Sequence, residues 1–157
     1  MKTVNDSKSV LSEVMLPGQA NPAGTVHGGE IMKLMDACGG VAAMRHAKTN
    51  VVTVRVDELV FYQPILVGQL VICEAELVFV GSTSMEMKIT VKVEDLMSDV
   101  LTKVALTAYF TYVALDEKGK PCKVPELLLE TEEQKTAYEN GKKRYLEHKT
   151  NNTKVSQ

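Results

Sequence analysis

A nearly uncharged stretch in the first third of the chain constrains the fold more than any other feature. Between residues 31 and 44 the charged side chains are Lys33 and Asp36 alone, and the others are Ile, Met, Leu, Ala, Cys, Val and Gly. An acidic residue before this stretch and basic residues after it suit the two ends of a helix dipole, so one helix is predicted over residues 30–48. A helix that is apolar on nearly all sides is expected to be buried on nearly all sides, and the rest of the chain must wrap around it.

The segments around this helix have the patterns of β-strands. In residues 84–94, apolar side chains at every second position alternate with charged or hydroxyl side chains, which predicts one buried and one solvated face. Turn residues and short links favour an antiparallel meander of consecutive strands. The order of elements predicts an α+β fold, in which an antiparallel sheet curls around one central helix. The predicted strands are residues 10–16, 51–61, 70–80, 84–94 and 101–115.

The two ends of the chain are expected to contribute less to this fold. The first eight residues are polar and are predicted to be loose. Residues 126–148 are rich in Glu, Lys and Leu and predict an amphipathic, mostly exposed helix, followed by a disordered tail from residue 150. We therefore expect one domain over residues 1–125, and a C-terminal amphipathic helix with a disordered tail over residues 126–157.

Composition and charge argue against several classes of function. The formal net charge is −2, which is unlike the basic domains that bind nucleic acid broadly. The sequence has no run of 18 apolar residues and no apolar segment of a signal peptide at its start, so no membrane span is expected. Cys38, Cys73 and Cys122 are an odd number of thiols without a CxxC pair, which favours a reducing, cytoplasmic setting.

Asp36 is the strongest candidate for chemistry. A carboxylate in an apolar helix costs several kcal/mol unless it is paired, hydrated or neutralised. It is either an ordinary helix-surface or capping residue or, as we favour, a catalytic carboxylate at a cleft. Gly39 and Gly40 lie one turn later on the same side of the helix, where each glycine costs roughly 1 kcal/mol relative to Ala. Such glycines are expected where another backbone or a ligand approaches closely.

Gly28 and Gly29 open the predicted helix and expose unpaired backbone N–H groups at its positive end. These donors can hold an anion or a developing oxyanion, although glycine pairs are also common in plain loops. Gly29 and Asp36 are separated by ~10 Å along the helix axis, so one small carbonyl cannot touch both in a single chain. If both act on the same atom, Asp36 must come from a second subunit in a two-fold dimer with two equivalent sites.

Asn21 and His27 lie in the loop that leads to these glycines. Asn21 could orient a water or donate to a carbonyl, but Asn-Pro is a standard turn opener, and the residues alone favour the turn. His27 could act as a general base, or it could hydrogen-bond locally and hold the loop, which we favour. The histidines lack metal-ligand spacing, and the sequence has no GxSxG elbow, P-loop or GxGxxG fingerprint.

Residues 21–36, NPAGTVHGGEIMKLMD, closely resemble the hot dog-fold acyl-CoA thioesterases, in particular the cytosolic brain-type acyl-CoA hydrolases and their short bacterial relatives. Softer similarities occur in residues 51–57, 61–68 and 81–86. The resemblance implies the hot dog fold and hydrolysis of acyl-CoA to a free acid and CoA. It also implies that Asn21 and Asp36 from different subunits are the catalytic pair, and that the Gly28 N–H polarises the thioester carbonyl. Dimers of this family often associate into trimers of dimers.

The resemblance also implies where CoA binds. The loop of Ser82, Thr83 and Ser84 would lie near the pantetheine or nucleotide part of CoA, and His27 and Gly29 are further candidates for contact with CoA. Arg55 is among the cations available to the CoA phosphates. No separate cofactor is implied, because CoA is part of the substrate and the product. The sequence departs from the family pattern directly after Asp36, where Ala-Cys follows, and this change could alter the acyl pocket.

Alternative functions remain open from the sequence. The chain could be a non-catalytic acyl-CoA sensor on the same fold, a hydratase acting on acyl thioesters, or a structural oligomer. A sensor is expected to lack polar side chains at the positions of Asn21 and Asp36. A hydratase usually pairs a catalytic histidine with a carboxylate, and the setting of His27 does not resemble that arrangement. For a hydrolase, Asp36 would either activate water or attack the thioester directly.

Overall fold

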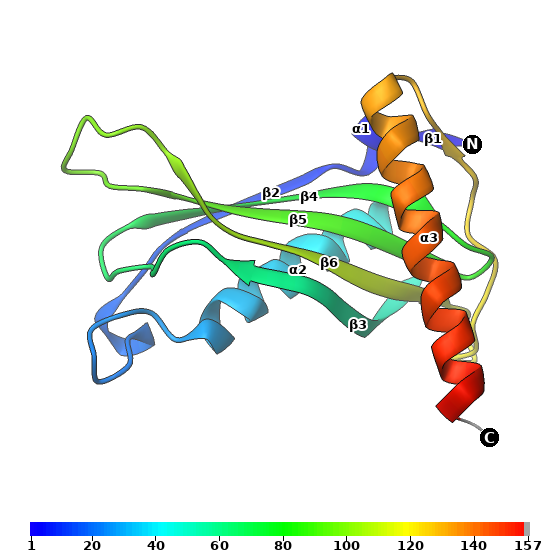
Figure 1. Cartoon of the computed structure of the whole chain (residues 1–157), viewed down its shortest axis with the longest axis horizontal. Helices are drawn as coiled ribbons and strands as arrows, with labels where there is room; N and C mark the ends of the chain where they lie inside the picture. Colours follow the sequence, from blue (N-terminus) through cyan, green and yellow to red (C-terminus); the bar gives the residue numbers. More distant parts are fainter. Residues whose placement is uncertain (156–157) are drawn as a thin grey trace.

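A curved five-stranded sheet and the helix α2 (Gly28–Ala47) dominate the computed structural model, which describes residues 1–155 (Figure 1). Every neighbouring pair of strands is antiparallel, and the order across the sheet is β2-β4-β5-β6-β3. Helix α2 lies against one face of the sheet, and α3 (Glu132–Val155) crosses the other face. The strands are β2 (Ser9–Val14), β3 (Asn50–Phe61), β4 (Leu70–Val80), β5 (Ser84–Glu94) and β6 (Lys103–Leu115). This arrangement confirms the predicted α+β fold.

The bounds of most elements follow the sequence pattern closely. Strands β4 and β5 coincide with the predicted segments, and α2 begins two residues earlier than expected. Lys48 ends α2 in the left-handed conformation (φ 58°), with its N–H donating to the carbonyl of Met44. The alternating apolar residues of β5 are buried on the face toward α2, as predicted, where each contributes about 1.5–3 kcal/mol of hydrophobic stabilisation. These residues are Met85, Met87, Ile89, Val91 and Val93.

The predicted meander of four consecutive strands is wrong for β3. Only β4, β5 and β6 follow one another across the sheet, whereas β3 lies at the far edge and pairs with β6. Residues 62–69 are long enough to lead from this edge strand back to β4. Alternation specifies which face of a strand is buried, but it does not specify the neighbouring strand. The register of β3 is interrupted twice along β6, and Glu58 within the second irregularity has φ 49°.

The N-terminal segment is folded, contrary to the prediction that it is loose. Strand β1 (Lys2–Thr3) pairs in parallel with β7 (Leu127–Leu128), and α1 (Val4–Ser7) follows it directly. The side chain of Thr3 caps α1, and the Val4 side chain is buried. The polar composition of this segment gave no sign of these contacts, because Val4 is the single apolar side chain that it buries.

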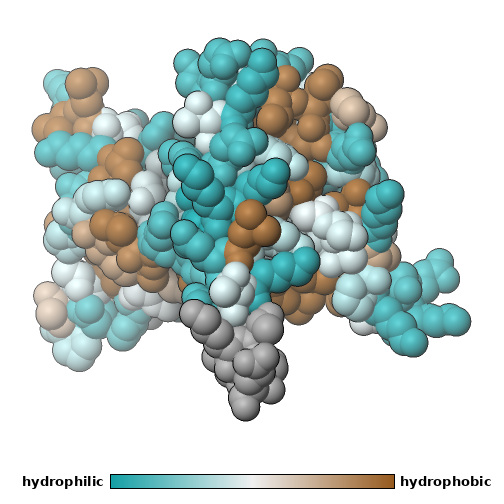
Figure 2. Space-filling view, turned by 45° about the vertical axis from the view of Figure 1, so that its right-hand side comes forward, coloured by the Kyte–Doolittle hydropathy of each residue, from teal (hydrophilic) through white to brown (hydrophobic). Residues whose placement is uncertain are grey.

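The C-terminal segment also differs from the prediction. Residues 126–131 precede the helix, and residues 150–155, expected to be a disordered tail, belong to α3; residues 156–157 lie outside the described part. Helix α3 presents mainly hydrophilic side chains outward, as Figure 2 shows, in agreement with an amphipathic helix. No helix within residues 1–155 combines the length and apolar character that a membrane span requires.

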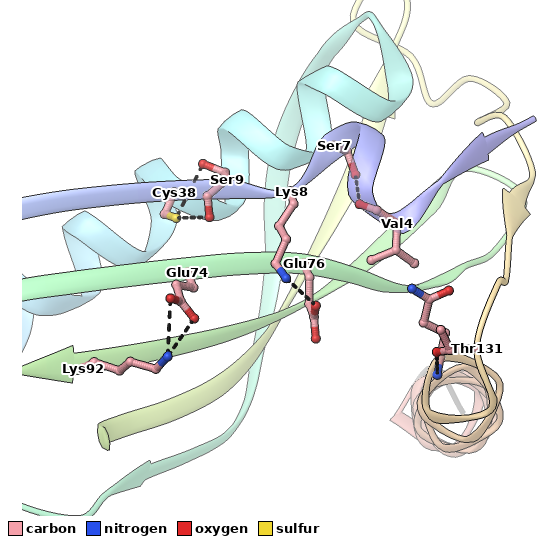
Figure 3. Close-up of polar contacts among 10 residues, drawn as sticks. Val4, Ser7, Lys8, Ser9, Cys38, Glu74, Glu76, Lys92 and Thr131 are labelled. Carbon is pink, nitrogen blue, oxygen red and sulfur yellow. Dashed lines mark hydrogen bonds and ion pairs between the residues drawn. The ribbon is translucent and has the colours of Figure 1, made fainter. Parts of the chain in front are cut away.

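Polar contacts fix β2 to its surroundings at the other edge of the sheet (Figure 3). The Cys38 thiol of α2 lies 3.6 Å from the carbonyl and the hydroxyl of Ser9, and 3.3 Å from the carbonyl of Cys73. On the outer face, Lys8 pairs with Glu76 at 3.6 Å. All three cysteines are free thiols in the structure.

Helix α2 is not buried on nearly all sides in a single chain, contrary to the prediction. One side of it is exposed, and the neighbouring edge strand β3 exposes a series of apolar side chains. An apolar edge strand without a neighbour is a ready template for pairing with another chain. We call this surface the α2–β3 face. Its exposed residues are Lys33, Asp36, Ala37 and Met44 of α2, and Thr53, Val56 and Phe61 of β3, which pair with the inward-facing residues Tyr112, Phe110 and Leu106.

Candidate functional site

The carboxylate of Asp36 is held by two hydroxyl groups from the sheet. Thr53 of β3 donates its Oγ1–H to Asp36 Oδ1 at 2.5 Å, and the Tyr112 hydroxyl of β6 lies 3.1 Å from the same oxygen. Thr53 and Tyr112 are direct cross-strand partners, so the β3–β6 pairing brings both under the middle of α2. The apolar residues around Asp36 in the sequence had indicated that it would be enclosed by apolar groups. In a single chain it is exposed instead.

Tyr112 reaches Asp36 from beneath the helix because Gly39 leaves room for its ring. A Cβ atom at Gly39 would lie 2.4 Å from the Tyr112 hydroxyl and 2.8 Å from Cδ1 of Ile89. The close approach predicted at the glycine pair is therefore made by side chains at Gly39, not by a backbone or a ligand. At Gly40 the same ring would be 4.0 Å away, which is an ordinary contact.

The Tyr112 hydroxyl is a permanent hydrogen-bond donor. Its side chain is 1% exposed, and this burial raises the pKa of Tyr112 above its usual value. The negative charge of Asp36 raises this pKa further, because a tyrosinate beside a carboxylate would be repelled. Both effects favour the protonated hydroxyl, which can donate a hydrogen bond.

Gly28 and Gly29 form the first turn of α2, at the same end of the helix as Phe61 of β3. Amide groups in the first turn of a helix have no partner within it, so they remain available as donors. A Cβ atom at Gly28 would lie 3.8 Å from Cζ of Phe61, whose side chain is 53% exposed. Gly28 and Asp36 are ~12 Å apart along the axis of α2, so one chain does not bring them together.

Asn21 organises its own loop. Its Oδ1 accepts hydrogen bonds from the N–H groups of Ala23 (3.0 Å) and Thr25 (3.2 Å), and its Nδ2 donates to Thr25 Oγ1 at 2.7 Å. This is the turn role that the residues alone favoured. His27 holds the loop through its backbone, because its N–H donates to the carbonyl of Gln19 at 2.9 Å while its side chain is exposed.

The loop of Ser82, Thr83 and Ser84 lies at the same end of the sheet as Tyr112. Ser84 pairs with Val113, the residue after Tyr112, and the Thr83 carbonyl accepts from the N–H of Ala114 at 2.9 Å. The loop is therefore two strands away from Thr53 and its bound Asp36.

Arg55 lies on the other face of β3 from Thr53. It pairs with Thr111, whose neighbours Phe110 and Tyr112 belong to the core beneath α2. Directly paired residues of an antiparallel sheet point to the same side, so Arg55 is on the outer face, where α3 packs. A single chain does not bring Arg55 to Asp36.

The sequence analysis missed Thr53 and Tyr112. Thr53 lies in residues 51–57, one of the softer family similarities, but that similarity assigned it no role, and Tyr112 belongs to no such segment. Each reaches Asp36 through the β3–β6 pairing, which the predicted meander did not contain. The residues that the structure gathers around Asp36 are thus hydroxyl donors, whereas Gly28 and Arg55 lie apart from it and the side-chain hydrogen bonds of Asn21 are within its own loop.

Comparison with known proteins places the chain in a family. The family model of the Thioesterase superfamily matches residues 23–99. The uncharacterized acyl-CoA thioester hydrolase YkhA of Bacillus subtilis is 34% identical over 144 residues, which are 92% of this chain and 83% of that protein. The chain belongs to the thioesterase superfamily. A cytosolic acyl coenzyme A thioester hydrolase of Rattus norvegicus is 40% identical over 148 residues, but this thioesterase spans only 39% of its length.

Solved structures give the same result for the fold. The acyl-CoA hydrolase of Staphylococcus aureus, in complex with butyryl-CoA, CoA and CoA disulfide, superimposes with a TM-score of 0.86 at 30% identity, covering 100% of this chain and 93% of that one. Other structures of that enzyme carry alanine in place of an asparagine, an aspartate or a threonine. The hexameric thioesterase y2039 of Yersinia pestis has a TM-score of 0.70 at 37% identity, with coverage of 75% and 95%. The hot dog fold expected from the sequence is therefore confirmed.

Proposed function

We propose that this thioesterase hydrolyses acyl-CoA to a free carboxylic acid and CoA. The observation that carries the proposal is the Asp36 carboxylate, fixed by Thr53 and Tyr112 on an open face of a chain whose relatives are named acyl-CoA thioester hydrolases. In the S. aureus enzyme, the altered aspartate follows the altered asparagine by 15 positions and precedes the altered threonine by 17. Asn21, Asp36 and Thr53 have the same spacing, which supports a role for all three.

In the proposed mechanism, Asp36 takes a proton from a water molecule as the water oxygen attacks the thioester carbonyl carbon. The tetrahedral oxyanion is stabilised by the Gly28 N–H at the start of α2, and Asn21 orients the water. The C–S bond then breaks, the CoA thiolate takes the proton held by Asp36, and the free acid is released, which returns Asp36 to its carboxylate form. Direct attack by the Asp36 carboxylate on the thioester carbonyl would instead release CoA thiolate and give a mixed anhydride, which water would then hydrolyse.

The proposed site combines two chains. Because the Gly28 turn lies two helical turns from Asp36, a partner whose helix runs antiparallel must supply it, and the apolar α2–β3 face supports such pairing. Phe61 lies beside Gly28 and would accompany it to the partner's carboxylate, where its exposed ring would border the acyl group. The hexameric Y. pestis relative supports further assembly into a trimer of dimers.

The remaining expectations are part of the same proposal. The loop of Ser82, Thr83 and Ser84 is proposed to contact CoA, together with His27 and Gly29, and the reaction is proposed to need no resident cofactor. The position of Arg55 on the outer face gives no support to a contact with the phosphates of CoA bound at the same chain's Asp36. The cytosolic relatives support a cytoplasmic location.

Thiol release from a panel of acyl-CoAs tests the proposed function. The purified chain is expected to liberate CoA from at least one thioester, detected with a thiol reagent, and the dependence on acyl length would identify the substrate. Binding of acyl-CoA without thiol release from any chain length would indicate a sensor. Addition of water to an enoyl-CoA without thiol release would indicate a hydratase, and either result would contradict the proposal.

Mixing two inactive variants tests the shared site. Gly28→Pro removes the proposed donor but suits the first position of a helix, and the extended backbone of His27 (ψ 133°) tolerates a following proline. We expect this variant to lose about 10²–10³ in kcat, and Gly28→Ala, which keeps the N–H, to retain most of its activity.

Co-expression of Gly28→Pro with Asp36→Asn is expected to restore about a quarter of the wild-type activity. Half of the randomly assembled dimers are mixed, and each mixed dimer has one intact site of two. If Gly28 and Asp36 act within one chain, mixed dimers have no intact site and the mixture stays inactive. That result would overturn the two-chain site without affecting the proposed reaction.

A further inference from the structure

We infer that Tyr112 is a positioning residue, which fixes the orientation of the Asp36 carboxylate so that Oδ2 is the oxygen that meets the reacting water. This inference rests on the proposed function. The Tyr112 hydroxyl lies 3.1 Å from Asp36 Oδ1 and 3.0 Å from the backbone carbonyl of Asp36. Its single proton is shared between them, so the ring is tied both to the helix and to the carboxylate.

The two oxygens of the carboxylate have different surroundings. Oδ1 accepts from Thr53 and faces Tyr112, and within residues 1–155 no hydrogen bond to Oδ2 occurs. A carboxylate held through one oxygen by two donors on neighbouring strands cannot rotate freely about its terminal bond. Oδ2 is then the oxygen left with lone pairs for a water molecule, on a residue that is exposed in a single chain.

The pairing of β6 and the space at Gly39 fix the position of the Tyr112 ring. Its position is set by β6, which is paired on both sides, with β3 through Thr53 and with β5 through Met85. The ring is buried, and Gly39 is the residue whose lack of a side chain admits it. A glycine in a helix interior costs roughly 1 kcal/mol relative to Ala. The space that Gly39 leaves for the Tyr112 ring therefore lowers the stability of the helix.

The two donors, the buried Tyr112 hydroxyl and the exposed Thr53 hydroxyl, both serve Oδ1. Neither competes with a water molecule for Oδ2. Tyr112 touches neither water nor substrate in this arrangement, so it acts through Asp36 and is not itself a catalytic residue.

Tyr112→Phe, which removes the hydroxyl and keeps the ring, tests this inference. We expect kcat for the preferred acyl-CoA to fall about 10- to 100-fold, because the carboxylate loses its fixed orientation. We expect KM to change less than about threefold, because the groups that bind the substrate are retained. The acidic limb of the kcat/KM profile is expected to move to higher pH, because a donor to the charged carboxylate has been lost. A merely structural role would not move this limb.

The matched control is Tyr109→Phe, three residues earlier on β6 and on the outer face beneath Arg144. It removes a hydroxyl far from Asp36 and is expected to leave kcat and the pH profile unchanged. Melting temperatures and circular dichroism establish that both variants are folded. If Tyr112→Phe does not fold, 3-fluorotyrosine at the same position supplies a stronger donor, and the acidic limb is then expected to move to lower pH.

The outcomes separate this inference from the proposed function. Loss of activity in Asp36→Asn together with unchanged kcat and pH profile in Tyr112→Phe would overturn the role of Tyr112 alone. A large rise in KM at constant kcat would also overturn it, because Tyr112 would then bind substrate. Full turnover by Asp36→Asn would instead overturn the proposed role of the carboxylate.

Discussion

Asp36→Asn is expected to hydrolyse acyl-CoA about 10²–10⁴ times more slowly than the wild type, because an amide cannot take the proton of the attacking water. Asparagine has nearly the same size, and its Oδ1 can still accept from Thr53 and from Tyr112, so the surroundings of the site are retained. The loss is expected in kcat, with KM nearly unchanged, since the proposed proton transfer occurs in the transition state. Steady-state thiol release provides both constants.

Asp99→Asn is the control for this substitution. Asp99 is exposed in the connection between β5 and β6, and it makes the same change of charge without touching α2. Its kcat and melting temperature are expected to equal those of the wild type. An Asp36→Asn enzyme that keeps more than about a third of the wild-type kcat would show that Asp36 is neither base nor nucleophile.

The strands could be predicted from the sequence because alternation is a local property. Residues 84–94 carry their buried face in their own pattern, and β5 coincides with that segment. The neighbour of β3 could not be predicted, because pairing joins residues that are distant in the chain. Thr53 and Tyr112 are 59 positions apart, and their meeting depends on the β3–β6 pairing. The error in strand order is therefore the reason that two hydroxyl donors of the site were missed.

The candidate site was predicted in part. The spacing of Gly28 and Asp36 on one helix already separates them by two turns, and the structure retains that separation. The predicted burial of α2 on nearly all sides was wrong for one chain, because the apolar residues of α2 and β3 leave an open face. Apolar composition measures how much surface is to be covered, but it does not distinguish coverage by the same chain from coverage by a second one.

The outer face of the sheet also shows that a local pattern does not reveal which distant segment covers a surface. The alternation in β5 predicts that Glu86 is solvated, yet its side chain is 5% exposed because α3 packs over it. Gly141 of α3 makes this approach possible, since a Cβ there would lie 2.7 Å from Cβ of Phe79. Nothing in the pattern of residues 84–94 indicates that a helix beginning at residue 132 covers the polar side of this strand.

Arg144→Met is expected to lower the free energy of unfolding by about 3–5 kcal/mol at pH 7.5, because it leaves a buried carboxylate without its partner. Arg144 Nη2 donates to Glu86 Oε1 at 2.7 Å, its Nε donates to the same oxygen at 3.0 Å, and its guanidinium lies 3.7 Å from the centre of the Tyr109 ring. Burial raises the pKa of Glu86, and the charge and hydrogen bonds of Arg144 oppose that rise. Urea unfolding followed by circular dichroism measures the loss.

The pH dependence and a double variant identify the cause of this loss. Without Arg144, the pKa of Glu86 in the folded state rises further above its unfolded value, so the destabilisation is largest at pH values above that folded pKa and diminishes as the pH falls through it. Glu86→Gln combined with Arg144→Met removes both charges and is expected to recover most of the stability. Lys135→Met, which breaks an exposed ion pair with Glu132 on the same helix, is expected to change it by less than about 0.5 kcal/mol. If Arg144→Met costs as little as Lys135→Met, the buried pair does not hold α3 to the sheet.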